Sequence, residues 1–558
     1  MLLPSYFQLS LSNPDETGLV LVSLIDSRTG FIVRTALPNS GVQTASIMAF
    51  AGARYSRSSI TANELFKEIK DADRTANERL STIFRNYGHA SVADMAQLFA
   101  YIENIPQLYA CKFYNETSIG GGQERSTRYQ DFSDSVVEGL DRQINETTLL
   151  QVHESTEYIE VNEDYKELQS IALNNYRKHV DLLTEKLAEV YEVDTTDKKQ
   201  KSALTARVFD CARYFLPNGT CNRTSICWIT SAREWARIIS QFKSQKDFNL
   251  QYLAEQLEFL FAPDQEVAKN HGYQPEAADL IRYTKADETT SNNIKYLKEF
   301  LVEAGFESEA EFDQDQMFKP VSVKLLDASI SAGTKIVAQN ILSIYPTLDE
   351  NWLLQWITEL DNKQKKELSE KLLQNYDHHR QMGNQFRVNT HSFVVYCSIG
   401  EGRDLNRHRA WGRFMPMLAS EQNYYNHLDS GYTLPMYLSE NSVLDTQRQI
   451  FEEDLQNYYK KLRLFTDKTK EIAWFPHHLI LQLLPFASIM KIWFHGSPKE
   501  ISYLTKLRVR PGGHINYRAI AYFMSREAAK SDNLLQGLSI DESKQPDPTS
   551  RTEFLDRS

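Results

Sequence analysis

Two kinds of hydrophobic periodicity run through the chain and predict both strands and helices. Residues 19–37 form two runs rich in β-branched and aliphatic residues around the turn sequence Asp26-Ser27-Arg28-Thr29-Gly30, which predicts a β-hairpin. Elsewhere apolar residues recur every three or four positions, as on one face of a helix. The two clearest sets are Val92, Met95, Phe99 and Ile102, ahead of Pro106, and Leu250, Leu253, Leu257 and Leu260.

Features of the first half of the chain recur in the same order in the second half. The matching features are the runs Val22–Ser27 and Val323–Ala328, the turns at His89 and His378, and the Leu-Pro pairs at 216–217 and 484–485. This order predicts a strongly diverged internal duplication, and chance similarity between short runs is the alternative. Because hairpins and helices are mixed in each half, we expect an α+β fold of two tandem domains, each a mixed sheet with packed helices.

Polarity along the chain predicts the domain boundaries. We expect the first domain to span residues 1–263 and the second to span 319–530. The stretch 264–318 is polar, acidic and only weakly periodic, and is therefore predicted to connect the two domains. Apolar residues become sparse after that second domain, which predicts a mobile tail over 531–558.

Composition and charge exclude several classes of protein. The 558 residues are 41% hydrophobic and 24% charged, as in ordinary folded domains, and a net charge of −12 argues against nucleic acid as a partner. We expect no membrane segment and no secretion signal, because no long apolar run occurs and the first residues lack a basic region. The five cysteines form no Cys-x-x-Cys pair, which predicts a cytoplasmic protein with neither disulfides nor a metal site.

The polar motif of the first half is Gly120–Tyr129. Its three glycines allow the backbone to approach a ligand closely, and Ser126 and Arg128 present a hydroxyl and a guanidinium that suit a phosphate oxygen. A glycine turn before a solvated strand is the alternative. Further on, Arg213 lies in an apolar helical stretch and needs an anionic partner, either a ligand or a buried carboxylate.

Basic residues cluster at two places in the second half. The triplet Arg407-His408-Arg409 concentrates positive charge, which predicts an anion site or, alternatively, a solvated basic turn. Arg508 ends a helical run and is followed by a Pro-Gly-Gly turn, then by His514 and Asn516. Both halves therefore carry candidate anion-binding residues.

Together these motifs resemble the flavin-dependent thymidylate synthase family, whose signature is R-H-R-x-x-S-x-N-x-x-S-x-R-Y. The first half has the end of this signature at Gln123–Tyr129, but Glu116-Thr117-Ser118 stands in place of R-H-R. The second half has R-H-R at residues 407–409, but Met417-Leu418-Ala419-Ser420 stands in place of S-x-R-Y. The signature is thus divided between the halves.

Other family features are divided in the same way. The phosphate-binding arginine of the family matches Arg213 in the first half but Leu481 in the second, whereas its catalytic arginine matches Arg508, with Phe242-Lys243 at the first-half position. In that family each site is assembled between subunits of a tetramer. Two fused halves can each lose the residues of one abandoned site, so the resemblance implies one composite site per chain and a homodimer that mimics the tetramer.

The resemblance also implies a reaction and its site residues. The reaction is reductive methylation of dUMP to dTMP, with methylenetetrahydrofolate as carbon donor and with FAD that is reduced by NADPH. Arg508 would be catalytic, stabilising negative charge on the pyrimidine. The implied dUMP-binding residues are Glu124, Arg125, Ser126, Thr127, Arg128, Arg213, Asp404 and Arg407. The implied FAD-binding residues are Ser56, Ser91, Gln123, Ser231, Arg233, Arg237, Arg407, His408, Arg409 and His514.

Two alternatives remain open from the sequence. A non-catalytic homologue would bind flavin or nucleotide without turnover, and a related flavin enzyme would act on another pyrimidine nucleotide. Gly121 replaces the first serine of the signature and Ser231 replaces the asparagine of the family's N-A-R stretch, which favours a changed specificity. No cysteine lies in the Pro-Cys-His setting of cysteine-dependent thymidylate synthases, so no protein nucleophile is expected.

Overall fold

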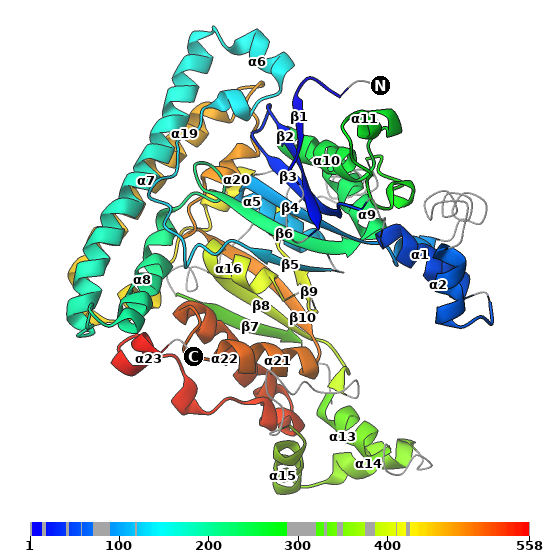
Figure 1. Cartoon of the computed structure of the whole chain (residues 1–558). Coiled ribbons are helices and arrows are strands. Elements are labelled where there is room, and N and C mark those ends of the chain that lie inside the picture. Colours follow the sequence, from blue (N-terminus) through cyan, green and yellow to red (C-terminus); the bar gives the residue numbers. More distant parts are fainter. Residues whose placement is uncertain are drawn as a thin grey trace, which may run out of the picture.

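Two antiparallel β-sheets lie next to each other at the centre of the molecule, and helices pack around them (Figure 1). This arrangement confirms the expected α+β class. The computed structural model describes residues 3–13, 18–40, 44–56, 58–70, 90–117, 120–286, 320–327, 332–342, 350–373, 386–408, 410–419 and 424–556.

The first sheet has six strands and the second has four. In the first, the order across the sheet is β1 (Phe7–Leu11), β2 (Leu19–Asp26), β3 (Ile32–Pro38), β4 (Gln97–Pro106), β6 (Arg223–Ser231) and β5 (Gly121–Glu124). In the second, it is β7 (Ser322–Asp327), β8 (His391–Ser398), β10 (Ile489–Gly496) and β9 (Gly412–Phe414). β2 and β3 form the predicted hairpin, with Ile25 opposite Ile32. The paired strands are antiparallel in both sheets. The sequence predicts mixed sheets, and the described strands differ from that prediction.

The second sheet has the same strand order as one end of the first, β3-β4-β6-β5 matching β7-β8-β10-β9. β4 and β8 lead directly into α5 (Gln107–Glu116) and α16 (Ile399–Asn406), and β6 and β10 lead into α9 (Ala232–Lys243) and α21 (Pro498–Arg508). The register agrees as well, since Gly121 lies opposite Ile229 and Gly412 lies opposite His495. By this order β7 corresponds to β3, so the match that the sequence suggests between β7 and β2 is wrong.

The two Leu-Pro segments lie against each other where the halves meet. The amide of Asn218 donates a hydrogen bond to the carbonyl of Leu484 (2.7 Å), and the amide of Phe486 donates one to the carbonyl of Leu216 (2.9 Å). Pro217 and Pro485 form an antiparallel bridge between these bonds. Because each segment donates and accepts in the same way, the contact has the form of a local two-fold axis.

Long helices also pack across the two halves. α7 (Thr156–Val190) lies along α19 (Asp445–Thr469) on one side of the sheets, and α8 (Lys198–Ala212) packs against α7 (Figure 1). α10 (Phe248–Phe261) covers part of the first sheet with its predicted leucines buried, and α22 (Ile515–Ser531) covers part of the second. The other α-helices of the described residues are α1 (Thr44–Tyr55), α2 (Ala62–Lys70), α4 (Ala90–Ala93), α6 (Glu146–Val152), α11 (Gln265–Asn270), α13 (Ala332–Leu342), α14 (Glu350–Glu359), α15 (Asn362–Leu373), α17 (Pro416–Ala419), α18 (Met436–Ser439), α20 (Leu479–Leu483) and α23 (Arg551–Leu555).

The helix predicted over residues 92–102 is wrong. α4 ends at Ala93, and the chain then enters strand β4 at Gln97. In this strand Leu98, Ala100 and Ile102 are buried on one face, in the period of two that a strand requires. Pairing with β3 and β6 on both sides therefore outweighs the weaker helical spacing.

The predicted connector and tail are both more ordered than the sequence indicates. Within 264–318, α11 and the turn at Ala278–Leu280 contribute buried residues to the main hydrophobic core, whereas residues 287–319 lie outside the described part. The tail predicted over 531–558 is not free: Leu535 and Phe554 are fully buried. A few well-spaced apolar residues are enough to dock this segment. Within the described ranges, no helix is long and apolar enough to cross a membrane.

Candidate active site

Acidic and basic side chains from the two halves converge between β5 and α16. Glu124 ends β5, and its buried carboxylate lies 2.8 Å from Arg403 Nε and accepts a hydrogen bond from Arg407 Nη2 (3.1 Å). Arg403 Nη1 also donates to Thr127 Oγ1 (2.9 Å). Since Arg403 and Arg407 are one helical turn apart on α16, the short helix presents both to the same loop of the first half.

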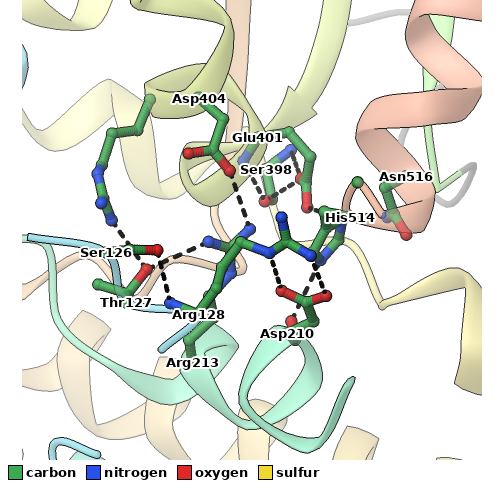
Figure 2. Close-up of polar contacts among 12 residues, drawn as sticks. Ser126, Thr127, Arg128, Asp210, Arg213, Ser398, Glu401, Asp404, His514 and Asn516 are labelled. Carbon is green, nitrogen blue, oxygen red and sulfur yellow. Dashed lines mark hydrogen bonds and ion pairs between the residues drawn. The ribbon is translucent and has the colours of Figure 1, made fainter. Parts of the chain in front are cut away.

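Arg213 and Arg128 lie beside this cluster (Figure 2). Arg213 is fully buried and donates to Thr127 Oγ1 (3.2 Å) and to Asp404 Oδ2 (3.4 Å). Arg128 donates from Nε and Nη2 to the two carboxylate oxygens of Asp210, at 2.6 and 3.0 Å. This two-point geometry fixes the plane of the guanidinium.

Two carboxylates at the site, Asp404 and Asp210, are held ionised by the arginines around them. Burial by itself would raise the pKa of Asp404, but the positive charges around it, Arg213 first, hold that pKa well below its usual range. At Asp210 the same opposition between burial and nearby cations, chiefly Arg128, lowers the pKa to about 2. The cluster is therefore an array of fixed charges at neutral pH.

A second network of hydrogen bonds, centred on the carboxylate of Glu401, runs from beside Arg213 to the start of α22 (Figure 2). Tyr214 donates its hydroxyl proton to Glu401 Oε1 (2.6 Å), and His514 Nδ1 lies 3.4 Å from the same oxygen. Asn516 Nδ2 donates to the Tyr214 hydroxyl (3.1 Å), and Ser398 donates to the other oxygen of Glu401. These residues come from both halves and are buried, so they tie the two sheets together beneath the site.

Arg508 lines a cavity of about 500 Å³ together with Arg407 and His408, which directly follow α16. Its Nε donates to His408 Nε2 (3.0 Å), and the hydroxyl of Tyr517 lies 2.6 Å from the same ring nitrogen. Burial, reinforced by the positive charge of Arg508, lowers the pKa of His408, so the ring is neutral and carries its proton on Nδ1. The residues that line the cavity are Gly120, Arg387, Arg407, His408, Ala410, Trp411, Lys499, Glu500, Tyr503, Leu507 and Arg508.

Two of the three glycines of the first-half motif, Gly120 and Gly122, allow this segment to pack closely on β6. Gly120 has a φ of 134°, where a side chain is strained, and a Cβ there would lie 2.7 Å from the carbonyl of Ile229. At Gly122 a Cβ would overlap the ring of Trp228. Gly120 alone of the three lines the cavity, so the expected close approach of this backbone to a ligand is limited to one residue.

Several residues that the sequence suggested do not line this cavity and make local contacts instead. Ser56 donates to the carbonyl of Ala53, Ser231 caps the start of α9, and Arg233 pairs with Asp94. Arg237 pairs with Glu234 and Glu116, Gln123 is exposed on β5, and Arg125 pairs with Glu103 at the surface. The hydroxyl oxygen of Ser126 accepts a hydrogen bond from the backbone amide of Arg128, and Ser126 is the residue before Thr127 of the cluster. His89, His378 and Arg409 lie outside the described residues, as does the side chain of Ser91.

The sequence interpretation missed Arg403, Asp210, Glu401 and Tyr517. Arg403 and Asp210 each precede a predicted site residue by one helical turn, Arg407 and Arg213, so helical spacing was a usable signal for them. Glu401 and Tyr517 stand at the same spacing from Asp404 and His514, but the contacts that give them a role join segments far apart in the chain, which spacing alone does not indicate. Across the described ranges, no group of three or more His, Cys, Asp or Glu residues could hold a metal ion.

The free energy of unfolding is expected to rise as the pH increases from 5 to 7. Burial is the largest cause of the lowered pKa values of His408, His478 and His514, so the unfolded chain binds more protons below its histidine pKa of about 6.5. Asp210 and Asp404 titrate below this window and do not oppose the trend. Urea unfolding at pH 5, 6 and 7 measures the slope, which His514→Gln should reduce; equal stability at all three pH values would contradict the assignment.

A family model matches the part of the chain that carries the site residues of the first half. The sequence model of the family described as thymidylate synthase complementing protein matches residues 41–262, which include β5, the Glu124–Arg128 loop and Arg213. A UPF0159 protein of Chlamydia pneumoniae is 22% identical over 452 residues, 80% of this chain and 77% of the relative. One from Chlamydia muridarum is 22% identical over 477 residues, 83% of this chain and 81% of the relative.

Similar solved structures include two that match about two fifths of this chain. The UMP/dUMP methylase PolB from Streptomyces cacaoi, bound with 5-Br dUMP, has 16% identity and a TM-score of 0.31, and the match covers 39% of this chain and 93% of that one. The flavin-dependent thymidylate synthase ThyX from Helicobacter pylori, complexed with FAD and dUMP, has 17% identity and a TM-score of 0.25, with 41% and 93% covered.

Proposed function

We propose that this chain is a flavin-dependent thymidylate synthase that methylates dUMP to dTMP, with methylenetetrahydrofolate and NADPH as co-substrates. Its one site per chain would be shared between the two halves. The observation that carries the proposal is the convergence of residues that the sequence divides: Glu124 meets Arg407, and Arg213 meets Asp404. Random decay of an inactive duplicate would not favour this complementary division of the charged residues between the halves.

Two buried donors favour an anionic ligand at this cluster. Arg213 Nε and Arg407 Nε are buried, and neither has a hydrogen-bond partner in the described part of the chain. A buried unpaired donor is costly, so such groups usually face a ligand or an ordered water. The phosphate of dUMP would accept from Arg128 and Arg213, with the hydroxyls of Ser126 and Thr127 beside it.

The residues around the Arg508 cavity suit a flavin nucleotide. Arg387, Arg407 and Lys499 supply cations for its phosphates, and Trp411 and Tyr503 supply flat apolar surface for its ring. When bound, the flavin would supply the hydride chemistry that no amino-acid side chain can perform. Arg508 would hold positive charge against the pyrimidine, and neutral His408 would orient its guanidinium.

A matching network supports the duplication and the loss of the second site. Tyr109 is the third residue of α5, as Glu401 is of α16, and Asp247 occupies the N-cap position of α10, as His514 does that of α22. Tyr109 donates to Asp247 (2.7 Å) and accepts from Gln482 (3.4 Å), which precedes Pro485 as Tyr214 precedes Pro217. The same three positions are thus joined again, but with Leu481 in place of the phosphate-binding arginine.

We also propose that two chains form a homodimer. Ser56 and Arg233 belong to family motifs but lie away from the cavity of their own chain, which fits a role at the site of a partner chain. Light scattering tests this assembly.

Release of tritium from 5-tritiated dUMP tests the function. The purified, FAD-loaded chain should release tritium in the presence of NADPH and methylenetetrahydrofolate, because methylation replaces the hydrogen at C5. Absorbance near 450 nm, about where oxidised flavin absorbs, reports cofactor binding separately. Bound flavin without tritium release would favour the non-catalytic homologue, and release from another labelled pyrimidine nucleotide alone would favour a different substrate.

A further inference from the structure

The loop that follows Arg508 is held by arginines at nearly every carbonyl. Arg518 Nε donates to the carbonyl of Val509 (3.1 Å), and Arg128 Nη2 donates to that of Gly512 (3.4 Å). Arg207 donates to the carbonyls of Pro511 (2.9 Å) and Gly513 (3.0 Å). The carbonyl of Arg510 accepts from the Gly513 amide (3.1 Å). Each carbonyl from 509 to 513 therefore accepts a hydrogen bond from the protein, although a Pro-Gly-Gly turn would otherwise be flexible.

The C-terminal segment, residues 550–556, shares two of these arginines. Arg207 also donates to the carbonyls of Phe554 (3.4 Å) and Asp556 (3.2 Å), and Arg518 Nη2 donates to Glu553 Oε2 (2.8 Å). Arg207 and Arg518 are each 1% exposed, so both guanidinium groups depend on protein acceptors rather than on water. Figure 1 shows α23 beside α8, the helix that carries Arg207.

The segment itself is firmly anchored. Phe554 is fully buried and stacks on Tyr191, with ring centroids 3.9 Å apart and planes at 5°. Arg551 donates to the carbonyls of Tyr191 (2.8 Å) and Glu192 (3.1 Å). The ring of Phe554 fixes the position of the nearby carbonyls that Arg207 binds. Contacts far from the cavity therefore set the direction of the Arg207 guanidinium.

We propose that the C-terminal segment is a positioning element for Arg508: through Arg207 and Arg518 it holds the loop 509–513 in the conformation that places Arg508 in the cavity. The inference rests on the proposed function for its catalytic consequence. The restraint of the loop 509–513 by the C-terminal segment does not depend on the proposed function. Arg207 and Arg518 are positioning residues, since neither lines the Arg508 cavity.

Removal of the Glu553 carboxylate tests the proposal. Glu553→Ala leaves Arg518 with a buried charge and one fewer acceptor, and we expect the amides of residues 508–514 to exchange with deuterium about tenfold faster. The turnover number should fall about tenfold while the KM for dUMP stays within about twofold, because Arg128 keeps both hydrogen bonds to Asp210 and Arg213 keeps those to Thr127 and Asp404. Glu542→Ala is the matched control, since Glu542 lies in the same region, is itself exposed, and pairs with half-buried Arg526 rather than with Arg207 or Arg518.

A chain that ends at Thr549 is the stronger variant and should show larger effects of the same kind. Unchanged exchange at 508–514 in Glu553→Ala, with the fold intact by melting temperature, would overturn the proposal. Equal acceleration in Glu542→Ala would overturn it too, because the effect would then be general loosening. If the wild type has no activity, the proposed function fails, whereas the exchange measurement still decides whether the tail restrains the loop.

Discussion

Replacing Arg508 by alanine is expected to lower the rate of tritium release from dUMP by about 100- to 1000-fold, the usual cost of removing one preorganised charge donor. In the structure this guanidinium is fixed by His408 Nε2 at 3.0 Å and lies 5.1 Å from the ring centre of Tyr517. Because its orientation is set before substrate binds, its loss should appear in the turnover number rather than in the KM for dUMP.

Arg510→Ala is the matched control for this prediction. Arg510 is two residues further on, is exposed, and does not line the Arg508 cavity. It should retain most of the activity, and both variants should keep the flavin absorbance of the wild type. Equal losses in the two variants would mean that the loop, and not the charge of Arg508, limits the rate.

Replacing Arg213 by leucine is expected to weaken dUMP binding about 100-fold, since a charge-assisted hydrogen bond contributes about 1.5–3 kcal/mol. Leucine is the residue at the corresponding position of the second half, Leu481. The same change should lower the free energy of unfolding by about 3–5 kcal/mol, because Asp404 loses a buried partner. Isothermal calorimetry and urea unfolding measure the two effects.

A double variant separates binding from stability. Arg213→Leu combined with Asp404→Asn removes both charges of the pair and should recover most of the lost stability, but not the affinity for dUMP. Recovery of affinity together with stability would show that Arg213 acts only in folding, and the phosphate assignment would then be wrong.

Local chemistry could be predicted from the sequence because it depends on neighbours along the chain. The hairpin at 19–37, the leucine face of α10 and the anionic partner required by Arg213 are all confirmed by the structure. β4 was mistaken for a helix because its place between two strands is a property of the sheet. The tail predicted as mobile is docked because a few spaced apolar residues, Leu535 and Phe554 among them, are buried.

What the amino-acid order alone determined is which chemical groups exist in each half: a serine–arginine loop and a buried arginine in one, a basic triplet and a terminal arginine in the other. Only the tertiary structure decided that they meet. Glu124 and Arg403 are in contact although they stand 279 positions apart in the chain, and the pairing of the Leu-Pro segments and the packing of α7 on α19 bring them together. The reason is physical: a contact between distant segments depends on the summed packing of everything that lies between them, which no short stretch of sequence records.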